Sequence, residues 1–323
     1  MPPYEQALGD LNRAIELDPG NASAVASRGE TYRLMRRYDE ALADLNRAVE
    51  LDPGGARVIA IRGLVYRHTK RYEEALADFD RAAELSPGNA LTIAGRGETY
   101  RLMQRYDQAL ADFNRAVELA PGYAWVVAAR GKAYGRMGRY DEALADFDRA
   151  VELSPGNALT IADRGETYRL IQRYDQALAD LNRAVELDPG YAWAIAIRGQ
   201  VYHAMQRYDD ALADFNRAVE LDPSYNLDFA SRGDIFASRG DIYRLMKRYD
   251  QALADFNRAI ELDPDKSWAV GLRGTTYLQM KRYGKALADL KRLYKLKLKE
   301  REAAQDLSRR PGTDVSTTPS PPD

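Results

Sequence analysis

Apolar positions along the chain follow the spacing of α-helices. In residues 22–55, Val25, Gly29 and Tyr32 succeed one another at intervals of four and three residues, as one helix face requires. A second apolar stripe comprises Tyr38, Ala41, Leu42, Leu45, Ala48, Val49 and Leu51. Acidic residues open this stripe, where they offset the helix dipole, and a Pro-Gly pair stops it. The pattern predicts a hairpin of two helices.

The hairpin pattern recurs with a period of 34 residues, broken by one step of 41. Its prolines are Pro19, Pro53, Pro87, Pro121, Pro155, Pro189, Pro223 and Pro264. An Arg-Gly pair marks each first helix, with glycines at Gly29, Gly63, Gly97, Gly131, Gly165, Gly199, Gly240 and Gly274. Most of the 21 tyrosines belong to two columns of this repeat. Since one hairpin cannot bury its own apolar face, the units must stack.

The repeated residues resemble the tetratricopeptide repeat family. In the first full unit the resemblance is carried by Gly29, Tyr32, Ala41, Leu45, Ala48 and Pro53, and it covers about residues 1–298. The resemblance implies an all-α, right-handed α–α superhelix whose first helices line a concave groove for peptide or protein segments. One departure is consistent, because an Arg precedes each Gly where the family often has Leu.

The repeat boundaries divide the chain into four parts. Residues 1–20 form a half-repeat with only a second helix, residues 21–298 hold the tandem units, residues 299–310 extend the last helix as a cap, and residues 311–323 form a disordered tail. The chain therefore begins inside a repeat. Either the half-repeat is a natural cap, or the chain is a piece of a longer array.

The 41-residue step has a visible cause at 229–242, where the heptapeptide FASRGDI occurs twice. Seven residues advance a helix by nearly two full turns, so its apolar face stays in register. We expect the first helix of this unit to be about two turns longer than the others. A bulged loop is the alternative, because Gly233 would lie inside the longer helix.

Composition excludes several classes of protein. The chain is 45% apolar with 30% charged residues, and its net charge of −2 gives no general attraction to nucleic acid. It has no Cys, no long apolar run for a membrane span and no N-terminal signal sequence. We therefore expect a cytoplasmic protein, and the richness in Ala and Arg resembles repeat proteins of high-GC bacteria such as actinomycetes.

No known catalytic or cofactor-binding motif occurs in the sequence. The two histidines, His68 and His203, lie four units apart, so we expect neither a metal site nor a catalytic dyad. Acidic pairs such as Asp39-Glu40 recur in most units, which is typical of helix starts. The sequence predicts a protein that is not an enzyme and that has no cofactor.

The Arg before each Gly should face the paired second helix. Each second helix offers one Asp to it, at Asp44, Asp78, Asp112, Asp146, Asp180, Asp214, Asp255 and Asp289. We predict a ladder of Arg–Asp pairs, with Arg28 bound to Asp44 or to an acid of the preceding helix. Such pairing would be structural, because a partly buried Arg needs a carboxylate.

The candidate binding residues lie on the inner face of the first helices, where the units differ most. They are Glu30, Arg33, Leu64, Arg67, Glu98, Arg101, Trp125, Lys132, Glu166, Arg169, Trp193, Gln200, His203, Asp241, Arg244 and Trp268, with Leu91 and Leu159 beside them. Partly exposed Trp and Arg side chains are typical binding anchors. The alternative is that the charged residues form ion pairs on a solvated face and that the Trp residues cover neighbouring helices.

Two specialised grooves of the resembled family are not expected. The Lys and Asn residues of a dicarboxylate clamp are replaced by Ala26, Ala60, Ala94, Ala128, Ala162 and Ala196. An Asn ladder is likewise replaced by Ser27, Ile61, Gly95, Ala129, Asp163, Ile197, Ser238 and Leu272.

The sequence thus predicts a non-catalytic scaffold or adaptor that holds a protein or peptide segment in its groove. Two alternatives stay open: a regulatory part of a larger multidomain protein, and docking to nucleic acid or an anionic surface through the basic segment 281–310. That segment carries eleven Lys and Arg against four Asp and Glu. Because these charges are mixed, we expect a solvated cap, and neither nucleic acid nor a membrane is an expected partner. The oligomeric state is not predicted.

Overall fold

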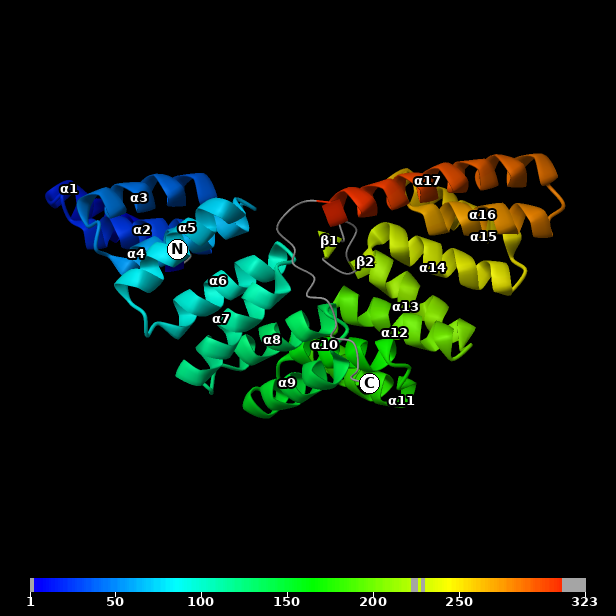
Figure 1. Ribbon diagram of the computed structural model, residues 1–323, viewed down its shortest axis with the longest axis horizontal. Coiled ribbons are helices and arrows are strands. Elements are labelled where there is room, and N and C mark those ends of the chain that lie inside the picture. Colours follow the sequence, from blue (N-terminus) through cyan, green and yellow to red (C-terminus); the bar gives the residue numbers. More distant parts are fainter. Residues whose placement is uncertain (1–2, 222–225, 228–229, 310–323) are drawn as a thin grey trace, which may run out of the picture. The chain divides into compact units, whose positions relative to one another are not determined.

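The computed structural model describes residues 3–221, 226–227 and 230–309. These residues form helices apart from one short two-stranded ladder and the connecting turns (Figure 1). The chain divides into two compact units, unit 1 (Met1–Arg173) and unit 2 (Tyr174–Asp323), each with its own core. The sequence suggested a single array. In a stack of hairpins each helix contacts only its neighbours, so a boundary between units can fall at any turn.

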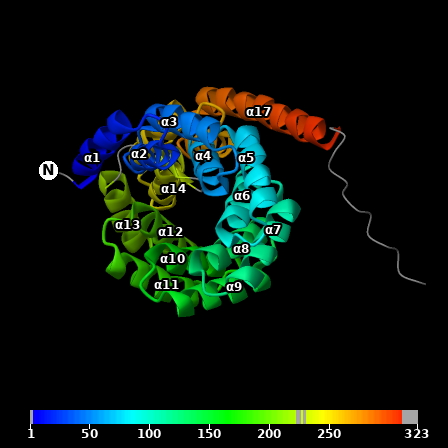
Figure 2. The same ribbon diagram turned by 90° about the vertical axis from the view of Figure 1, so that its left-hand side faces the viewer.

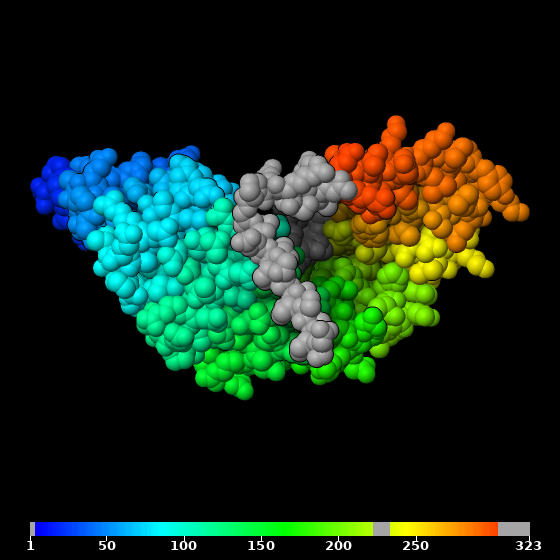
Figure 3. Space-filling model, in the orientation of Figure 1, coloured from blue at the N-terminus to red at the C-terminus, as the bar shows by residue number. Residues whose placement is uncertain are grey.

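Unit 1 consists of one helix, four hairpins and a further helix. Its elements are α1 (Pro3–Leu17), α2 (Ala22–Leu34), α3 (Tyr38–Leu51), α4 (Ala56–His68), α5 (Tyr72–Leu85), α6 (Ala90–Leu102), α7 (Tyr106–Leu119), α8 (Ala124–Arg136), α9 (Tyr140–Leu153) and α10 (Ala158–Leu170). The space-filling view shows neighbouring hairpins of this unit, coloured blue to green, in continuous contact (Figure 3). Helix α1 lies within the N-terminal segment 1–20.

Unit 2 begins with a single helix and contains three hairpins. Its elements are α11 (Tyr174–Leu187), α12 (Ala192–Ala204), α13 (Tyr208–Leu221), β1 (Asn226–Leu227), β2 (Ala230–Ser231), α14 (Arg232–Leu245), α15 (Tyr249–Leu262), α16 (Ser267–Gln279) and α17 (Tyr283–Arg309). The last helix is long, as predicted, and its described part ends at Arg309. The predicted disordered tail at 311–323 lies outside the described residues.

The expected lengthening of the first helix in the inserted unit is wrong. Helix α14 has 14 residues, one more than α12, and it begins at Arg232. The residues before it pair instead as an antiparallel ladder, with Asn226 opposite Ser231. Two extra turns would extend past the neighbouring 13-residue helices and would bury no apolar face, and isolated helical turns gain little stability by themselves.

The hairpin turns use the same backbone device in nearly every unit. A residue with φ near 60° follows the first helix, at Arg36, Lys70, Gln104, Gln172, Gln206, Lys247 and Lys281, while Gly138 (φ 75°) serves in the remaining turn. The next residue, such as Arg37, donates its backbone N–H to a Tyr carbonyl five residues earlier. Its guanidinium also stacks on that ring, 4.6 Å from the centroid of Tyr32. One Tyr column thereby secures the turn.

The first helices of successive hairpins lie on the inner side of the stack. In unit 1, α4 contacts α2 and α6, and α8 contacts α6 and α10. Figure 2 shows α6 and α8 on the inner side of α7 and α9. Because the first helices pack against one another from unit to unit, their side chains are brought close together on one face.

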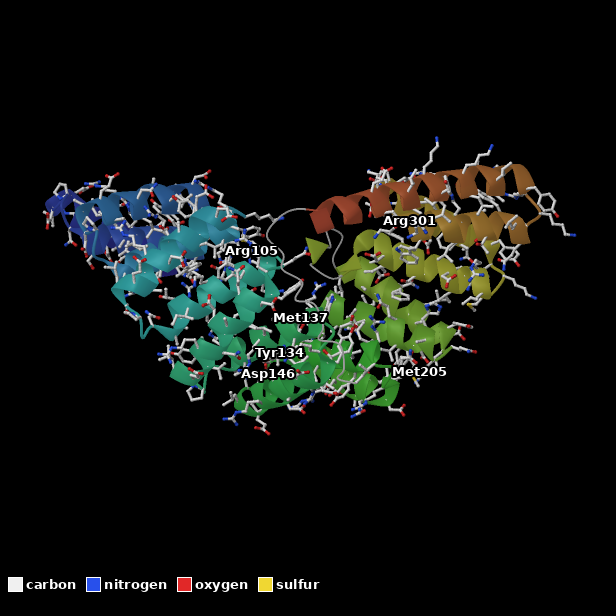
Figure 4. The ribbon with its side chains drawn as sticks, viewed as in Figure 1. Arg105, Tyr134, Met137, Asp146, Met205 and Arg301 are labelled. Atoms are coloured by element: carbon white, nitrogen blue, oxygen red, sulfur yellow. The ribbon has the colours of Figure 1, made fainter. Side chains whose placement is uncertain are left out.

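Small residues let the two helices of a hairpin approach closely. A Cβ atom added to Gly131 in α8 would lie 3.1 Å from the ring of Phe147 and 3.2 Å from the carbonyl of Ala143. Phe113 lies fully buried at the centre of the core formed by α6, α7 and α8. Tyr134 and Met137 cover the edge of this core (Figure 4).

The predicted Arg–Asp ladder is present in seven hairpins of the described chain. In each pair Nε and Nη2 of the Arg donate to both carboxylate oxygens at 2.6–2.9 Å, as between Arg28 and Asp44. The Nη1 atom donates to an Asn or Asp of the preceding second helix, as to Asn12 at 2.8 Å. Each such Arg therefore ties its own second helix to the preceding one.

Candidate functional site

Two adjoining hollows open on the inner face of unit 1. The first, of about 290 Å³, is lined mainly by apolar side chains of α4 and α6. Its lining residues are Glu30, Arg57, Ala60, Ile61, Leu64, Phe79, Asn89, Leu91 and Thr92. The side chain of Asn89 caps α6 by accepting from the backbone N–H groups of Leu91 and Thr92. This cap fixes the helix start beside which the half-exposed Leu91 projects.

The second hollow, of about 230 Å³, combines charged and apolar groups from α4, α6, α8 and α10. Its lining residues are Arg67, Glu98, Trp125, Ala128, Ala129, Lys132, Asn157, Leu159, Thr160 and Asp163. Four of these, Arg67, Glu98, Trp125 and Lys132, were predicted groove residues, and Leu159 was placed beside them. Trp125 is 44% exposed and Leu159 is 48% exposed, so both offer apolar surface to a ligand.

Several inner-face charges pair within one helix, as the alternative reading of the sequence proposed. Arg101 binds both carboxylate oxygens of Glu98 at 2.8 Å, and Arg169 binds Glu166 at 2.6 and 2.8 Å. In unit 2, Arg244 Nε donates to Asp241 at 2.8 Å. These are pairs of residues three apart on neighbouring helix turns.

Asp163 is a functional candidate that sequence reasoning missed. This buried carboxylate forms an ion pair with Lys132, whose Nζ lies 2.8 Å from Oδ2 of Asp163. Burial raises the pKa of Asp163, and the charge of Lys132 opposes that rise. The signal was available in the repeat: the same column holds Ile61 and Ala129, so an acid there stands out.

Arg33 and Arg67 make longer contacts with acceptor oxygens than do Arg101 and Arg169, which occupy the same repeat position. Arg33 Nη2 lies 3.9 Å from Glu30, which is bound more closely by Arg57 at 3.0 Å. Arg67 donates from Nη1 to the carbonyl of Gly95 at 3.4 Å. Loss of solvent lowers the pKa of Arg67. The charge of Glu98 opposes this effect, and the nearby charges of Arg101 and Arg33 add to it. The ion pair of Arg57 with Glu30 was not predicted from the sequence.

The three Trp residues differ in burial although they occupy the same repeat position. Trp125 and Trp268 are 44% and 40% exposed, whereas Trp193 is 3% exposed. The expectation that Trp193 offers surface to a partner is therefore wrong. Its ring packs near that of Tyr191, with centroids 5.7 Å apart. Local sequence could not show this difference, because Trp125 and Trp193 are both the last residue of the same tripeptide, Tyr-Ala-Trp.

The remaining candidates of unit 2 lie on α12 and α14. Gln200 is partly exposed, and His203 Nε2 lies 3.6 Å from the carboxylate of Asp241. Burial lowers the pKa of His203, and the charge of Asp241 opposes this effect. In unit 1 His68 stacks on Tyr38 with ring centroids 5.6 Å apart, and burial also lowers its pKa. Both histidines are thus held by neighbouring rings and charges.

Metal binding, membrane insertion and a basic docking surface are three further possibilities for the described part of the chain. Over those residues no group of three or more His, Asp and Glu side chains is placed to hold a metal ion. Within the same residues, no helix has both the length and the apolar character to cross a bilayer. In the basic last helix, Lys297 pairs with Glu300 at 2.7 Å and Lys299 pairs with Asp265. Part of its positive charge is therefore neutralised.

Family models described as tetratricopeptide repeat match most of the chain, from residue 4 to residue 266 with short gaps. They match residues 4–56, 35–90, 89–156, 123–190, 192–225 and 233–266. The chain belongs to the tetratricopeptide repeat family. No curated protein sequence matches it.

Solved structures share the tetratricopeptide repeat fold at low sequence identity. A chain of the APC/C hetero-tetramer Cut9–Hcn1 aligns with a TM-score of 0.69 and 18% identity over 94% of this chain, which spans 58% of that chain's length. A tetratricopeptide repeat protein from Parabacteroides merdae gives 0.61 and 18%, with coverage of 79% and 98%. Pseudomonas aeruginosa pilF gives 0.56 and 17%, with coverage of 63% and 93%. These likenesses support the predicted all-helical solenoid.

Proposed function

We propose that this tetratricopeptide repeat protein is a non-catalytic scaffold that binds a peptide or protein segment on the inner face of its first helices. The observation that carries the proposal is the pair of adjoining hollows in unit 1, where exposed Leu91, Trp125 and Leu159 lie beside charged groups. Such a mixture of apolar anchors and polar rim is typical of protein interfaces. The Cut9–Hcn1 relative, whose structure is of a hetero-tetramer, lends support.

The hollows suit a segment in extended conformation better than a small molecule. Each is open and shallow, and they follow one another along successive helices. An extended segment places alternate side chains on one side, so side chains two residues apart can enter the two hollows. The bacterial origin and cytoplasmic location suggested by composition stay predictions.

The proposal is tested by selecting binders from a random dodecapeptide library displayed on phage, using the full chain as bait. We expect selected peptides, made synthetically, to bind in solution and to bind Trp125→Ala at least about tenfold more weakly, since a buried aromatic anchor contributes strongly. Arg115→Ala is the control, because Arg115 lies on α7 in an exposed pair with Glu118. A library that yields no binder, or binders equally weakened by both substitutions, would contradict the proposal.

A further inference from the structure

Two arginines on the inner face of unit 1 lack the carboxylate that their counterparts bind. Arg101 and Arg169 each grip a Glu three residues earlier in the same helix with two short hydrogen bonds. Arg33 and Arg67 occupy the same repeat position on α2 and α4. Their surroundings differ in ways that leave positive charge available.

At Arg67 the cause is a single residue of the sequence. Leu64 stands three residues before it, where α2, α6 and α10 each have a Glu. Among the described residues, no carboxylate oxygen lies within 4 Å of Arg67, and its hydrogen bond to the Gly95 carbonyl is long at 3.4 Å. The guanidinium is nevertheless largely removed from solvent. A desolvated cation without a close counter-ion attracts an anion strongly.

At Arg33 the acid is present but engaged elsewhere. Glu30 forms its close ion pair with Arg57 at 3.0 Å, and Arg33 Nη2 remains 3.9 Å away. The Nε atom of Arg33 is buried and has no hydrogen-bond partner among the described residues. Arg33 therefore retains donors that a ligand oxygen could satisfy.

The neighbouring acids bind other cations more closely than they bind this pair, although the charge of Glu98 also acts on Arg67. Glu98 is held by both donors of Arg101, and Asp163 is held by Lys132. Counting the charged groups on this part of the inner face gives more cations than acids: Arg33, Arg57, Arg67, Arg101 and Lys132 against Glu30, Glu98 and Asp163. The excess is concentrated where Arg33 and Arg67 lie.

Apolar surface flanks the two arginines. Arg67 itself lines the 230 Å³ hollow together with Trp125 and Leu159. Leu64, one helical turn earlier, lines the 290 Å³ hollow with Ile61 and Leu91. A ligand that reaches Arg67 therefore passes beside apolar pockets.

We propose that Arg33 and Arg67, here called the arginine site, bind a carboxylate of an acidic peptide segment whose neighbouring apolar side chain enters an adjoining hollow. The inference rests on the proposed function and names the chemistry of its partner. A carboxylate presents two coplanar oxygens that match the guanidinium fork, and each charge-assisted hydrogen bond is stronger than a neutral one. The apolar side chain gains from the hollows that Leu64 and Trp125 line.

The test uses the same dodecapeptide selection on the full chain. We expect the selected peptides to be enriched in Asp or Glu two residues from Leu, Ile, Phe or Trp, because alternate side chains of an extended segment lie on one side. A synthetic representative should lose at least about tenfold in affinity when its acid is changed to the matching amide. Arg67→Gln should cause a similar loss for the acidic peptide and little change for the amide peptide, as a direct contact requires.

A second pair of variants at Leu64 tests the site without removing an arginine. Leu64→Glu supplies the carboxylate that Arg101 and Arg169 already have, so it should weaken the acidic peptide as much as Arg67→Gln does. Leu64→Gln changes the same side chain without adding charge and should weaken it less. Arg258→Gln, on α15 in an exposed pair with Glu261, is the unrelated control. Circular dichroism and urea midpoints establish that every variant is folded.

The outcomes separate the two proposals. Selected peptides that are neutral or basic, or acidic peptides indifferent to Arg33→Gln, Arg67→Gln and Leu64→Glu, would overturn the arginine site and leave the groove proposal standing. A selection that yields no peptide contradicts the groove proposal and the arginine site with it. An acidic peptide that loses affinity with Leu64→Glu but not with Leu64→Gln supports both.

Discussion

The charged residues of the inner face differ mainly in whether an oppositely charged side chain lies close to them. Glu98 and Arg101 form a closed pair, Lys132 and Asp163 form a buried one, and Arg67 has no close acid. Sequence spacing predicted the first of these, because residues three apart in a helix must meet. The second joins α8 to α10, and only the packing of those helices brings its members together.

Asp163 gives a pH dependence of stability with a definite sign. The pKa of Asp163 in the folded chain lies above the value of about 3.9 that is expected when the chain is unfolded. At a pH between the unfolded and the folded pKa, Asp163 is therefore protonated in the folded state and ionised in the unfolded state. The contribution of Asp163 to stability is therefore full below pH 3.9 and is lost as pH rises through its folded pKa.

Urea unfolding of the wild type and of Asp163→Asn between pH 4 and pH 7 measures this effect. We expect the stability of the wild type relative to the variant to be greater at pH 4 than at pH 7. Lys132→Gln should enlarge the difference, because it removes the charge that opposes the raised pKa. A relative stability that rises with pH would show that the carboxylate is not desolvated as described.

At the scale of a helix, close approach within a hairpin depends on where glycine falls. Gly131 faces α9, where an added Cβ would lie 3.1–3.2 Å from three neighbouring atoms. Gly135, one turn later in α8, has its nearest such neighbour at 3.9 Å. The repeat pattern predicted the small residue at Gly131, because the same column is Gly in every unit.

These two glycines make a matched pair for a stability measurement. Gly131→Ala should destabilise the protein by about 1–3 kcal/mol, because the core must shift to admit a methyl group. Gly135→Ala should stabilise it by about 0.5–1 kcal/mol, because Ala loses less backbone entropy in a helix and meets no clash. Urea unfolding measures both, and equal effects of the two substitutions would contradict the close packing of α8 on α9.

The length of helix α14 does not follow from the periodicity of its sequence. The duplicated heptapeptide keeps an apolar face in register, yet the helix does not extend through it. Register makes a longer helix possible, but burial against a neighbour decides whether it forms. The neighbouring helices α12 and α16 are 13 residues long and define the surface that can be covered.

At the scale of the whole molecule, stability is distributed over small, separate cores. Phe113 belongs to a core of unit 1 and Phe256 to a core of unit 2, and both are fully buried. In a stack of repeats each unit contacts only its neighbours, so the effect of a substitution should fade with distance along the chain.

Hydrogen exchange of two matched variants tests this localisation. Phe113→Ala should lower amide protection in α6–α8 by about 3–5 kcal/mol and leave α14–α16 close to wild type, while Phe256→Ala should do the reverse. Equal loss of protection in both units from either variant would mean that the chain unfolds as one cooperative body, contrary to the expectation for a repeat stack.

Much of this protein is determined by its sequence alone. The 34-residue period sets the helix hairpins, the Gly contacts and the Arg–Asp ladder, because the same short-range and next-neighbour contacts recur at every copy. Tertiary structure alone decided that Trp193 is buried while Trp125 is exposed, that α14 is short, and that Asp163 meets Lys132. Those outcomes depend on what each surface meets across the stack, which identical local sequences cannot encode.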